Sequence, residues 1–263
     1  MNQKIICTAC GTQYQLTLET KAVCPICLDD RQAVPEKGQT WTNLNELTDS
    51  HSVIIKKLND NLYELKMAPS FAIGQRALLV LTPSGNILWD CIALINEPTI
   101  EFIKSKGGLK AIAFSHPHYY TTMNEWAEIF NCPIYIQQKD EQWIFNKGEQ
   151  VILWSETEKE LWDGIKLINV GGHFPGSSIL YVPFLSKEGT ILCGDTFYIS
   201  PSKKHAAVMY SYPNRIPLPV QEVQRIKKQM SSIRFDTIHG FYDYQNIYGN
   251  AKRIIEDSLD RYF

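Results

Sequence analysis

Histidine is scarce in this chain, with six copies among 263 residues. Long hydrophobic runs are also missing. The longest runs, such as residues 77–81, fall far short of the roughly 20 apolar residues that a membrane-spanning helix needs. The N-terminus lacks the hydrophobic segment of a signal peptide. We therefore expect a cytoplasmic protein that makes no contact with a membrane.

An excess of charge of one sign is lacking as well, since the net charge is −2. A nucleic-acid partner is therefore not expected, because nucleic-acid-binding proteins present an excess of basic residues. Hydrophobic residues make up 44% of the chain and charged residues 21%, which is ordinary for a protein folded in water. This composition predicts one large core with a small appendage.

Cysteine occurs seven times, and four copies form two Cys-x-x-Cys pairs. Each pair turns two thiolates toward one point, and two pairs complete the tetrahedral shell of a structural zinc ion. The predicted zinc ligands are Cys7, Cys10, Cys24 and Cys27. The alternative is four buried thiols without a metal. The other three cysteines have apolar neighbours and are predicted to lie in the core: Cys91, Cys132 and Cys193. Free thiols of this kind indicate a reducing compartment.

The chain divides into three parts. Residues 1–30 resemble a zinc ribbon, with a strand-like alternation at 13–18 and an apolar pair at 22–23 that enters the second cysteine pair. So small a unit depends on its metal for folding. Residues 31–50 are predicted as a linker, because they are polar and contain proline and glycine. Residues 51–263 form the main domain.

The main domain shows alternating strands and helices. Its first strands are predicted as antiparallel hairpins over 52–57, 62–67, 76–81 and 86–91. Helices are predicted over 98–106, 122–130, 219–232 and 249–262. Further strands are predicted over 109–114, 134–136, 165–170, 178–183, 190–193 and 235–238. No internal repeat or low-complexity segment interrupts this pattern.

Three of the six histidines and one aspartate stand where predicted strands end. His116 and His118 are one residue apart, so in extended backbone both rings point to the same side. His173 lies among glycines that permit a tight turn, and Asp195 follows the strand 190–193. Neutral imidazoles with a carboxylate are a ligand set suited to Zn²⁺ or Fe²⁺. The predicted ligands of this second site are therefore His116, His118, His173 and Asp195.

These segments resemble the motifs of the metallo-β-lactamase-fold hydrolases. That family carries HxHxDH at a strand end, a later Gly-His-x-Pro-Gly-Ser segment, an aspartate after a strand and a final histidine. The match covers roughly residues 50–245, with Asp90 resembling the aspartate after an early strand and His239 in the place of the final histidine. The resemblance implies an α+β fold, an αββα sandwich with the metal site at one edge, here preceded by the small zinc ribbon.

The chain departs from the family pattern in the first motif. Tyr120 and Thr121 stand where the family has the aspartate and histidine that bind the second metal ion. The first site is complete, whereas the second retains only Asp195 and His239. We therefore expect one active-site ion, zinc or iron, besides the ribbon zinc. Asp195 is expected to bind that ion or its water. Asp195, His239 and Tyr120 are the candidate catalytic residues.

The resemblance and the intact first site predict a metallohydrolase that activates water on a small ester, thioester, lactone or related substrate. Two alternatives stay open. A single iron on the same ligands could support an oxygenase or oxidoreductase. A non-catalytic scaffold could use the ribbon to contact another macromolecule, in which case a protein is the expected partner.

Overall fold

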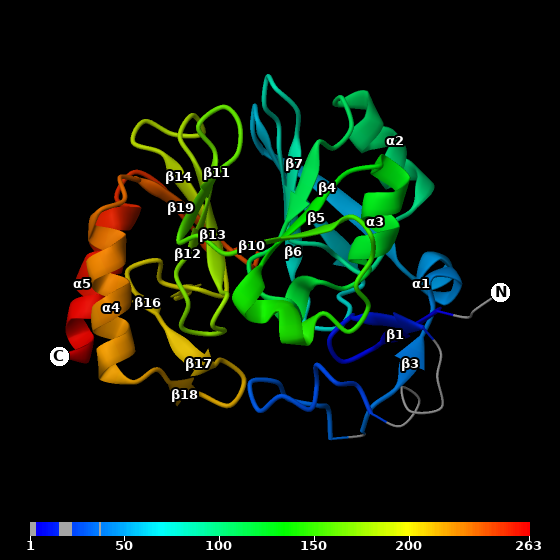
Figure 1. The fold of residues 1–263 in the computed structure, drawn as a ribbon, viewed down its shortest axis with the longest axis horizontal. Coiled ribbons are helices and arrows are strands. Elements are labelled where there is room, and N and C mark those ends of the chain that lie inside the picture. Colours follow the sequence, from blue (N-terminus) through cyan, green and yellow to red (C-terminus); the bar gives the residue numbers. More distant parts are fainter. Residues whose placement is uncertain (1–3, 16–22, 37) are drawn as a thin grey trace.

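Two β-sheets pack face to face between helices in the computed structural model, which describes residues 4–15, 23–36 and 38–263 (Figure 1). The first sheet has seven strands in the order β10-β9-β8-β7-β6-β5-β4. These strands are β4 Ser52–Asn59, β5 Leu62–Ala68, β6 Arg76–Val80, β7 Ile87–Trp89, β8 Ala111–Ala113, β9 Ile134–Gln137 and β10 Val151–Trp154. The first four are antiparallel neighbours, as predicted, and the last three join them in parallel.

The second sheet has six strands in the order β11-β12-β13-β14-β19-β20. They are β11 Glu158–Glu160, β12 Lys166–Asn169, β13 Ser178–Val182, β14 Thr190–Gly194, β19 Thr237–Gly240 and β20 Asn246–Ile247. Its pairs are antiparallel except β14 with β19. His239 lies within β19, whereas the sequence placed it just after a strand. Between the two sheets lies an apolar layer that includes Leu78, Trp89, Leu180 and Leu192.

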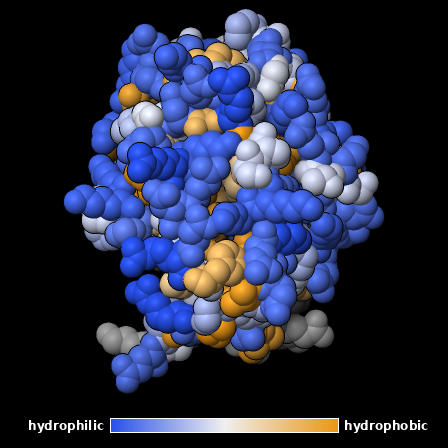
Figure 2. Space-filling model, turned by 90° about the vertical axis from the view of Figure 1, so that its left-hand side faces the viewer, coloured by the Kyte–Doolittle hydropathy of each residue, from blue (hydrophilic) through white to orange (hydrophobic). Residues whose placement is uncertain are grey.

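Helices cover the outer face of each sheet. α2 Glu97–Ser105 and α3 Met123–Phe130 pack on the first sheet, and α4 Val220–Ser231 and α5 Ala251–Leu259 pack on the second. All four were predicted, with bounds within two residues except at the C-terminal end of α5, which is three residues shorter than predicted. α4 buries Val223, Ile226 and Met230 and turns its polar side outward, and the face formed by α4 and α5 is mostly hydrophilic (Figure 2). The predicted α+β class and αββα sandwich are confirmed.

The remaining elements are short. Strands β15 Tyr198–Ile199 and β16 Ala206–Ala207 form one hairpin, and β17 Met209–Ser211 and β18 Ile216–Pro217 form another. The 3₁₀ segments are η1 Pro117–Tyr119, η2 Gln138–Trp143 and η3 Asp260–Tyr262. In the described ranges, no helix has the length and apolar character to cross a membrane. The three cysteines outside the ribbon are buried as predicted.

The N-terminal unit has its own small sheet, in the order β2-β1-β3. The strands are β1 Lys4–Cys7, β2 Gln13–Gln15 and β3 Trp41–Thr42. The predicted strand over 13–18 begins as β2, and its remainder, together with residue 22, lies outside the described residues. The segment 31–50 is more ordered than a linker, because it contains β3 and helix α1 Leu44–Ser50. Backbone pairing of β3 with β1 and the Asn43 cap on α1, neither visible as hydrophobic periodicity, account for this difference.

Candidate metal centre

His116 and His118 follow the buried strand β8. His116 is extended, with φ −171° and ψ 172°, as the sequence predicted. His118 is not extended, because Pro117 opens the 3₁₀ turn η1 directly after His116. The turn still brings the two rings together, with their centroids 5.0 Å apart. Both side chains are buried.

His173 lies in a loop that is fixed by its own hydrogen bonds. The hydroxyl of Ser177 accepts from the backbone N–H of Phe174 at 2.8 Å, and Ser178 N–H donates to the Ser115 carbonyl at 2.8 Å. The buried carboxylate of Asp140 accepts from Gly176 N–H at 2.6 Å. A Cβ on Gly176 would lie 2.4 Å from that carboxylate carbon, so only glycine fits. The loop therefore presents His173 from a constrained backbone.

Asp195 follows β14 and a glycine whose conformation is left-handed. Gly194 has φ +50°, and a Cβ there would lie 2.3 Å from the Ser115 hydroxyl oxygen. Glycine thus lets β14 approach the residue that precedes His116. One carboxylate oxygen of Asp195, Oδ1, accepts a 2.7 Å hydrogen bond from the Tyr119 hydroxyl. The other oxygen is free to face the histidines.

One potential ligand atom of each of the four residues lies within 4.8 Å of the others. His116 Nε2 is 3.4 Å and His173 Nε2 is 3.8 Å from Asp195 Oδ2, and His118 Nδ1 is 3.3 Å from His173 Nε2. Bonds of about 2.0 Å to a tetrahedral ion place the ligand atoms about 3.3 Å apart. His116 Nε2 is buried and has no hydrogen-bond partner in the described part of the chain. A metal ion supplies the partner that this nitrogen lacks, so the residues fit such an ion.

The hydrogen bonds behind the rings select which nitrogen carries the proton. The backbone carbonyl of Tyr210 can only accept, so His173 donates to it from Nδ1 at 2.7 Å and keeps its lone pair on Nε2. His116 Nδ1 lies 2.9 Å from the Ser115 hydroxyl, which donates to the Asp90 carboxylate at 2.9 Å. His116 therefore donates from Nδ1 and also keeps its lone pair on Nε2. Both lone pairs point toward Asp195.

The electrostatics keep His118 and His173 neutral. Burial, followed by the neighbouring His116, lowers the pKa of His173 to about 3 and holds the pKa of His118 well below its usual value. Neutral imidazole is the form that binds metal. Burial alone would raise the pKa of Asp195, but His116, His173 and the Tyr119 hydroxyl outweigh burial and lower it. The cluster thus holds neutral rings at His118 and His173 and a carboxylate at Asp195 at neutral pH.

Two candidate catalytic residues, Tyr120 and His239, do not belong to the four-residue cluster. Tyr120 is in the hydrophobic core against Phe114, with ring centroids 5.1 Å apart, and the hydroxyl that reaches Asp195 belongs to Tyr119. Extended backbone would place Tyr120 on the same side as His118. The 3₁₀ turn at Pro117 instead directs the Tyr119 hydroxyl to Asp195. His239 is buried outside the four-residue cluster and donates from Nδ1 to Asn246 Oδ1 at 2.7 Å.

A buried cation accompanies His239. Arg76 donates to the same Asn246 oxygen at 2.7 Å and to Glu64 at 2.5 Å. Burial and then the Arg76 charge lower the pKa of His239 to about 4. His239 is therefore neutral and shares Asn246 with a guanidinium, and the neighbouring positions Tyr120 and Thr121 carry neither a carboxylate nor an imidazole.

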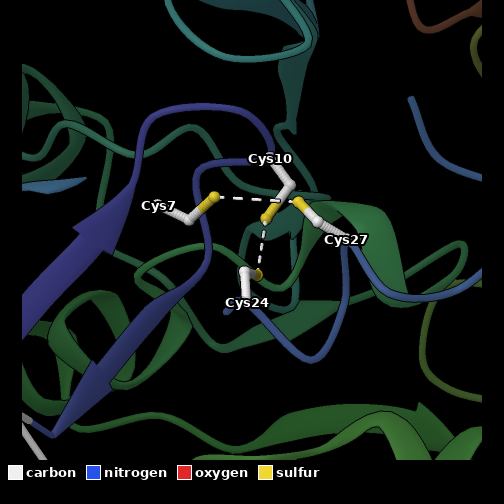
Figure 3. Close-up of side chains that lie close together, drawn as sticks. All are labelled: Cys7, Cys10, Cys24 and Cys27. Atoms are coloured by element: carbon white, nitrogen blue, oxygen red, sulfur yellow. Dashed lines mark hydrogen bonds between the residues drawn. The ribbon is translucent and has the colours of Figure 1, made fainter. Parts of the chain in front are cut away.

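The four ribbon cysteines converge on a second point (Figure 3). Cys7 Sγ lies 3.7 Å from Cys27 Sγ, and Cys10 Sγ lies 3.6 Å from Cys24 Sγ. Zinc–sulfur bonds of about 2.3 Å in a tetrahedron place the sulfurs about 3.8 Å apart. Gln39 donates to Cys7 Sγ at 2.7 Å, which favours a thiolate there. The sulfurs fit the structural zinc site that the sequence predicted.

The histidine cluster opens into a cavity of about 560 Å³. His118, His173 and Asp195 form part of its lining. Aromatic side chains form much of the remainder: Tyr198, Tyr212, Phe241, Tyr242 and Tyr244. Further lining comes from the ribbon and the segment after it: Thr8, Ala9, Gln32, Ala33 and Pro35. A cavity with a few convergent polar groups on an aromatic wall is typical of a site for a small molecule.

No protein-family model matches the chain. The uncharacterized protein YmaE of Bacillus subtilis (strain 168) is 36% identical to it over 260 residues, which is 98% of this chain and 94% of that protein. The chain belongs to the YmaE family. Because the match spans nearly the whole chain, the YmaE relationship includes the N-terminal unit as well as the sandwich.

Solved structures identify the fold of this YmaE-family member. The DIM-1 metallo-β-lactamase matches 80% of this chain and 98% of its own with a TM-score of 0.58 and 14% identity. The mono-zinc form of FIM-1 from Pseudomonas aeruginosa matches 80% and 95% with a TM-score of 0.56 and 13% identity. The di-iron form of TTHA1623 matches 73% and 98% with a TM-score of 0.53 and 19% identity. The YmaE-family chain thus has the metallo-β-lactamase fold that its motifs implied.

Proposed function

We propose that this protein is a metal-dependent hydrolase with one active-site ion, acting on a small ester, thioester, lactone or related bond. The observation that carries the proposal is the convergence of three imidazole nitrogens and Asp195 Oδ2 within 4.8 Å beside an aromatic cavity. His116, His118 and His173 would hold the ion. Such an ion lowers the pKa of its bound water to about 7 and polarises a substrate carbonyl oxygen.

Within this proposal, Asp195 is the proton acceptor. Its Oδ1 is held by the Tyr119 hydroxyl at 2.7 Å, so Oδ2 faces the nitrogens in a fixed orientation. Oδ2 would take a proton from the attacking water and pass it to the leaving oxygen or sulfur. The aromatic wall, which includes Tyr198, Tyr212 and Tyr242, would bind the substrate and exclude bulk water from the carboxylate.

Support for a single ion comes from the neighbourhood of His239. Asn246 Oδ1 accepts from both His239 and the buried Arg76 guanidinium, and among the described residues no cluster of three possible metal ligands includes His239. Tyr120 lies in the core and takes no part in the proposed mechanism. A two-metal clamp of the kind used on phosphodiesters is accordingly not part of this proposal.

Metal analysis of the purified protein tests the proposal. We expect the wild type to hold two zinc ions per chain, one at each cluster, and His118→Ala and Cys7→Ala to lose one each. Wild type, but not His118→Ala, should hydrolyse members of an ester, thioester and lactone panel. Iron lost only from His118→Ala, with oxygen consumption, would favour the oxygenase alternative. Retention of every metal ion in His118→Ala would refute both enzymatic alternatives.

A further inference from the structure

The segment that leaves the second cysteine pair runs past the histidine cluster. Arg31 Nε donates to the backbone carbonyl of His173 at 2.6 Å. The same guanidinium donates from Nη1 to both carboxylate oxygens of Asp29, at 2.8 and 2.7 Å. The side chains of Arg31 and Asp29 are only 11% and 14% exposed. This ion pair therefore fixes the guanidinium and directs Nε to the backbone of His173, one of the residues that would hold the metal.

The Arg31 guanidinium also stacks on the two residues that frame His173. It lies 4.4 Å from the ring centroid of Phe174, which follows His173, and 4.2 Å from that of Tyr210. Tyr210 supplies the carbonyl that accepts from His173 Nδ1. One side chain thus contacts the His173 carbonyl and the ring of Tyr210, the residue whose own carbonyl sets the tautomer of this imidazole.

Further hydrogen bonds hold the same two segments together. Ser211 Oγ donates to the Arg31 carbonyl at 2.9 Å, and Asn214 Nδ2 donates to the Asp30 carbonyl at 2.9 Å. The Tyr210 hydroxyl donates to Asp30 Oδ1 at 2.5 Å. In Figure 1 the chain after the ribbon accordingly runs close to the β17–β18 hairpin, far away in sequence. The His173 position depends on this contact as well as on its own loop.

The ribbon also reaches the cavity itself. Thr8 and Ala9, which lie between the first two cysteines, and Gln32 line the same cavity as His118 and Asp195. Cys7 Sγ and Cys10 Sγ anchor this knuckle, since they lie within 3.7 Å of the sulfurs of the second pair. Without a metal at the cysteines, both the knuckle and the start of the segment 29–35 lose their anchor.

We propose that the four-cysteine ribbon is a structural part of the active centre, and that Arg31 is the positioning residue that couples it to His173. Binding of a metal at the cysteines then strengthens binding of a metal at the histidines, and by linkage the reverse holds. The ribbon in this view is a wall of the substrate site, which differs from a docking module for another macromolecule. This inference concerns metal binding and does not depend on the hydrolytic reaction proposed above.

Co²⁺ affinity of the histidine site in full-length Arg31→Ala tests the coupling. The metal is measured by competition with a chromophoric chelator, and thiolate-bound Co²⁺ is told apart by its near-ultraviolet absorption. We expect about a 10- to 100-fold loss of affinity at the histidines with the cysteine site still filled. The Co²⁺ affinity of Arg31→Lys should lie between those of the wild type and Arg31→Ala. A lysine keeps the charge but loses the planar stacking and the contact with both carboxylate oxygens of Asp29.

The matched control is Arg234→Ala, since Arg234 is 79% exposed and pairs with Glu188, and neither residue belongs to a metal cluster or lines the cavity. This control should bind Co²⁺ as the wild type does. Cys27→Ser, which removes a ribbon ligand, should lower the affinity of the histidine site as Arg31→Ala does. Wild-type affinity in both Arg31 variants, with unchanged thermal unfolding, would overturn the proposal. If Arg31→Ala does not fold, Arg31→Lys carries the same comparison.

Discussion

The Tyr119 hydroxyl donates a 2.7 Å hydrogen bond to Asp195 Oδ1, while Oδ2 of the same carboxylate lies 3.4 Å from His116 Nε2. Burial raises the pKa of Tyr119 well above its usual value, so the hydroxyl stays protonated and remains a donor. The two oxygens of Asp195 thus have different tasks. One is held in place, and the other faces the imidazole nitrogens.

Tyr119→Phe should lower kcat about 10- to 100-fold, as expected when a hydrogen bond to a buried charge is lost. Burial then acts on Asp195 with one fewer opposing hydrogen bond, so the pKa of Asp195 rises and the acidic limb of the pH–rate profile moves to higher pH. Metal content should not change. Tyr120→Phe is the comparison, and an equal effect in that variant would contradict the assignment of Tyr119.

The metal ligands could be predicted from the sequence because each lies in a short local pattern. Both cysteine pairs, the His116-x-His118 spacing and the glycine-rich turn at His173 are recognisable within a few residues. The αββα sandwich could be predicted from the alternating pattern of the hairpin strands and from the family resemblance. The sequence singled out Tyr120 and not Tyr119, because the 3₁₀ turn at Pro117 decides which of these two buried side chains reaches Asp195.

The role of the segment after the ribbon could not be predicted in the same way. Arg31 stands in a polar stretch that lacks hydrophobic periodicity, which is also typical of a linker. Its partners are His173, Phe174 and Tyr210, which only tertiary folding brings near. A long-range contact between a side chain and a backbone carbonyl leaves no pattern in a single sequence.

A metal count on His239→Ala should separate a mononuclear from a dinuclear site. Because His239 is hydrogen-bonded to Asn246 and lies outside the cluster, we expect this variant to keep both metal ions of the wild type. His118→Ala, measured in parallel by elemental analysis, should lose one. Loss of a metal ion from His239→Ala with the fold intact would show that this histidine is a ligand.

Asp140 should make stability depend on pH. Burial raises its pKa to about 7 in the folded chain, against 3.8 for the usual carboxyl group. The folded state therefore binds more protons between these pH values, and the free energy of unfolding falls as pH rises through this window. Asp140→Asn keeps an acceptor for Gly176 N–H but does not ionise.

At pH 8 we expect Asp140→Asn to be more stable than the wild type by about 1–3 kcal/mol, with the difference shrinking toward pH 5.5. Urea unfolding at several pH values measures it. Acid also removes metal from both proteins, and its effect on the free energy of unfolding cancels when the two are compared at the same pH. Parallel stability curves would show that Asp140 has no raised pKa.

Arg215 should favour anionic substrates. It lines the cavity, its side chain is exposed, and no ion pair or hydrogen bond of its side chain occurs among the residues that the structure describes. The other formally charged side chain of the lining, apart from the histidines, is Asp195, which the imidazoles surround. A substrate carboxylate near the cavity mouth would therefore meet an uncompensated guanidinium.

Arg215→Ala should raise KM for an anionic ester about 5- to 10-fold, leave kcat nearly unchanged, and have little effect on a neutral ester of the same size. Added salt should raise the wild-type KM for the anionic ester and narrow the gap between the two proteins. Equal KM changes for both esters would mean that Arg215 acts through the shape of the cavity and not through its charge.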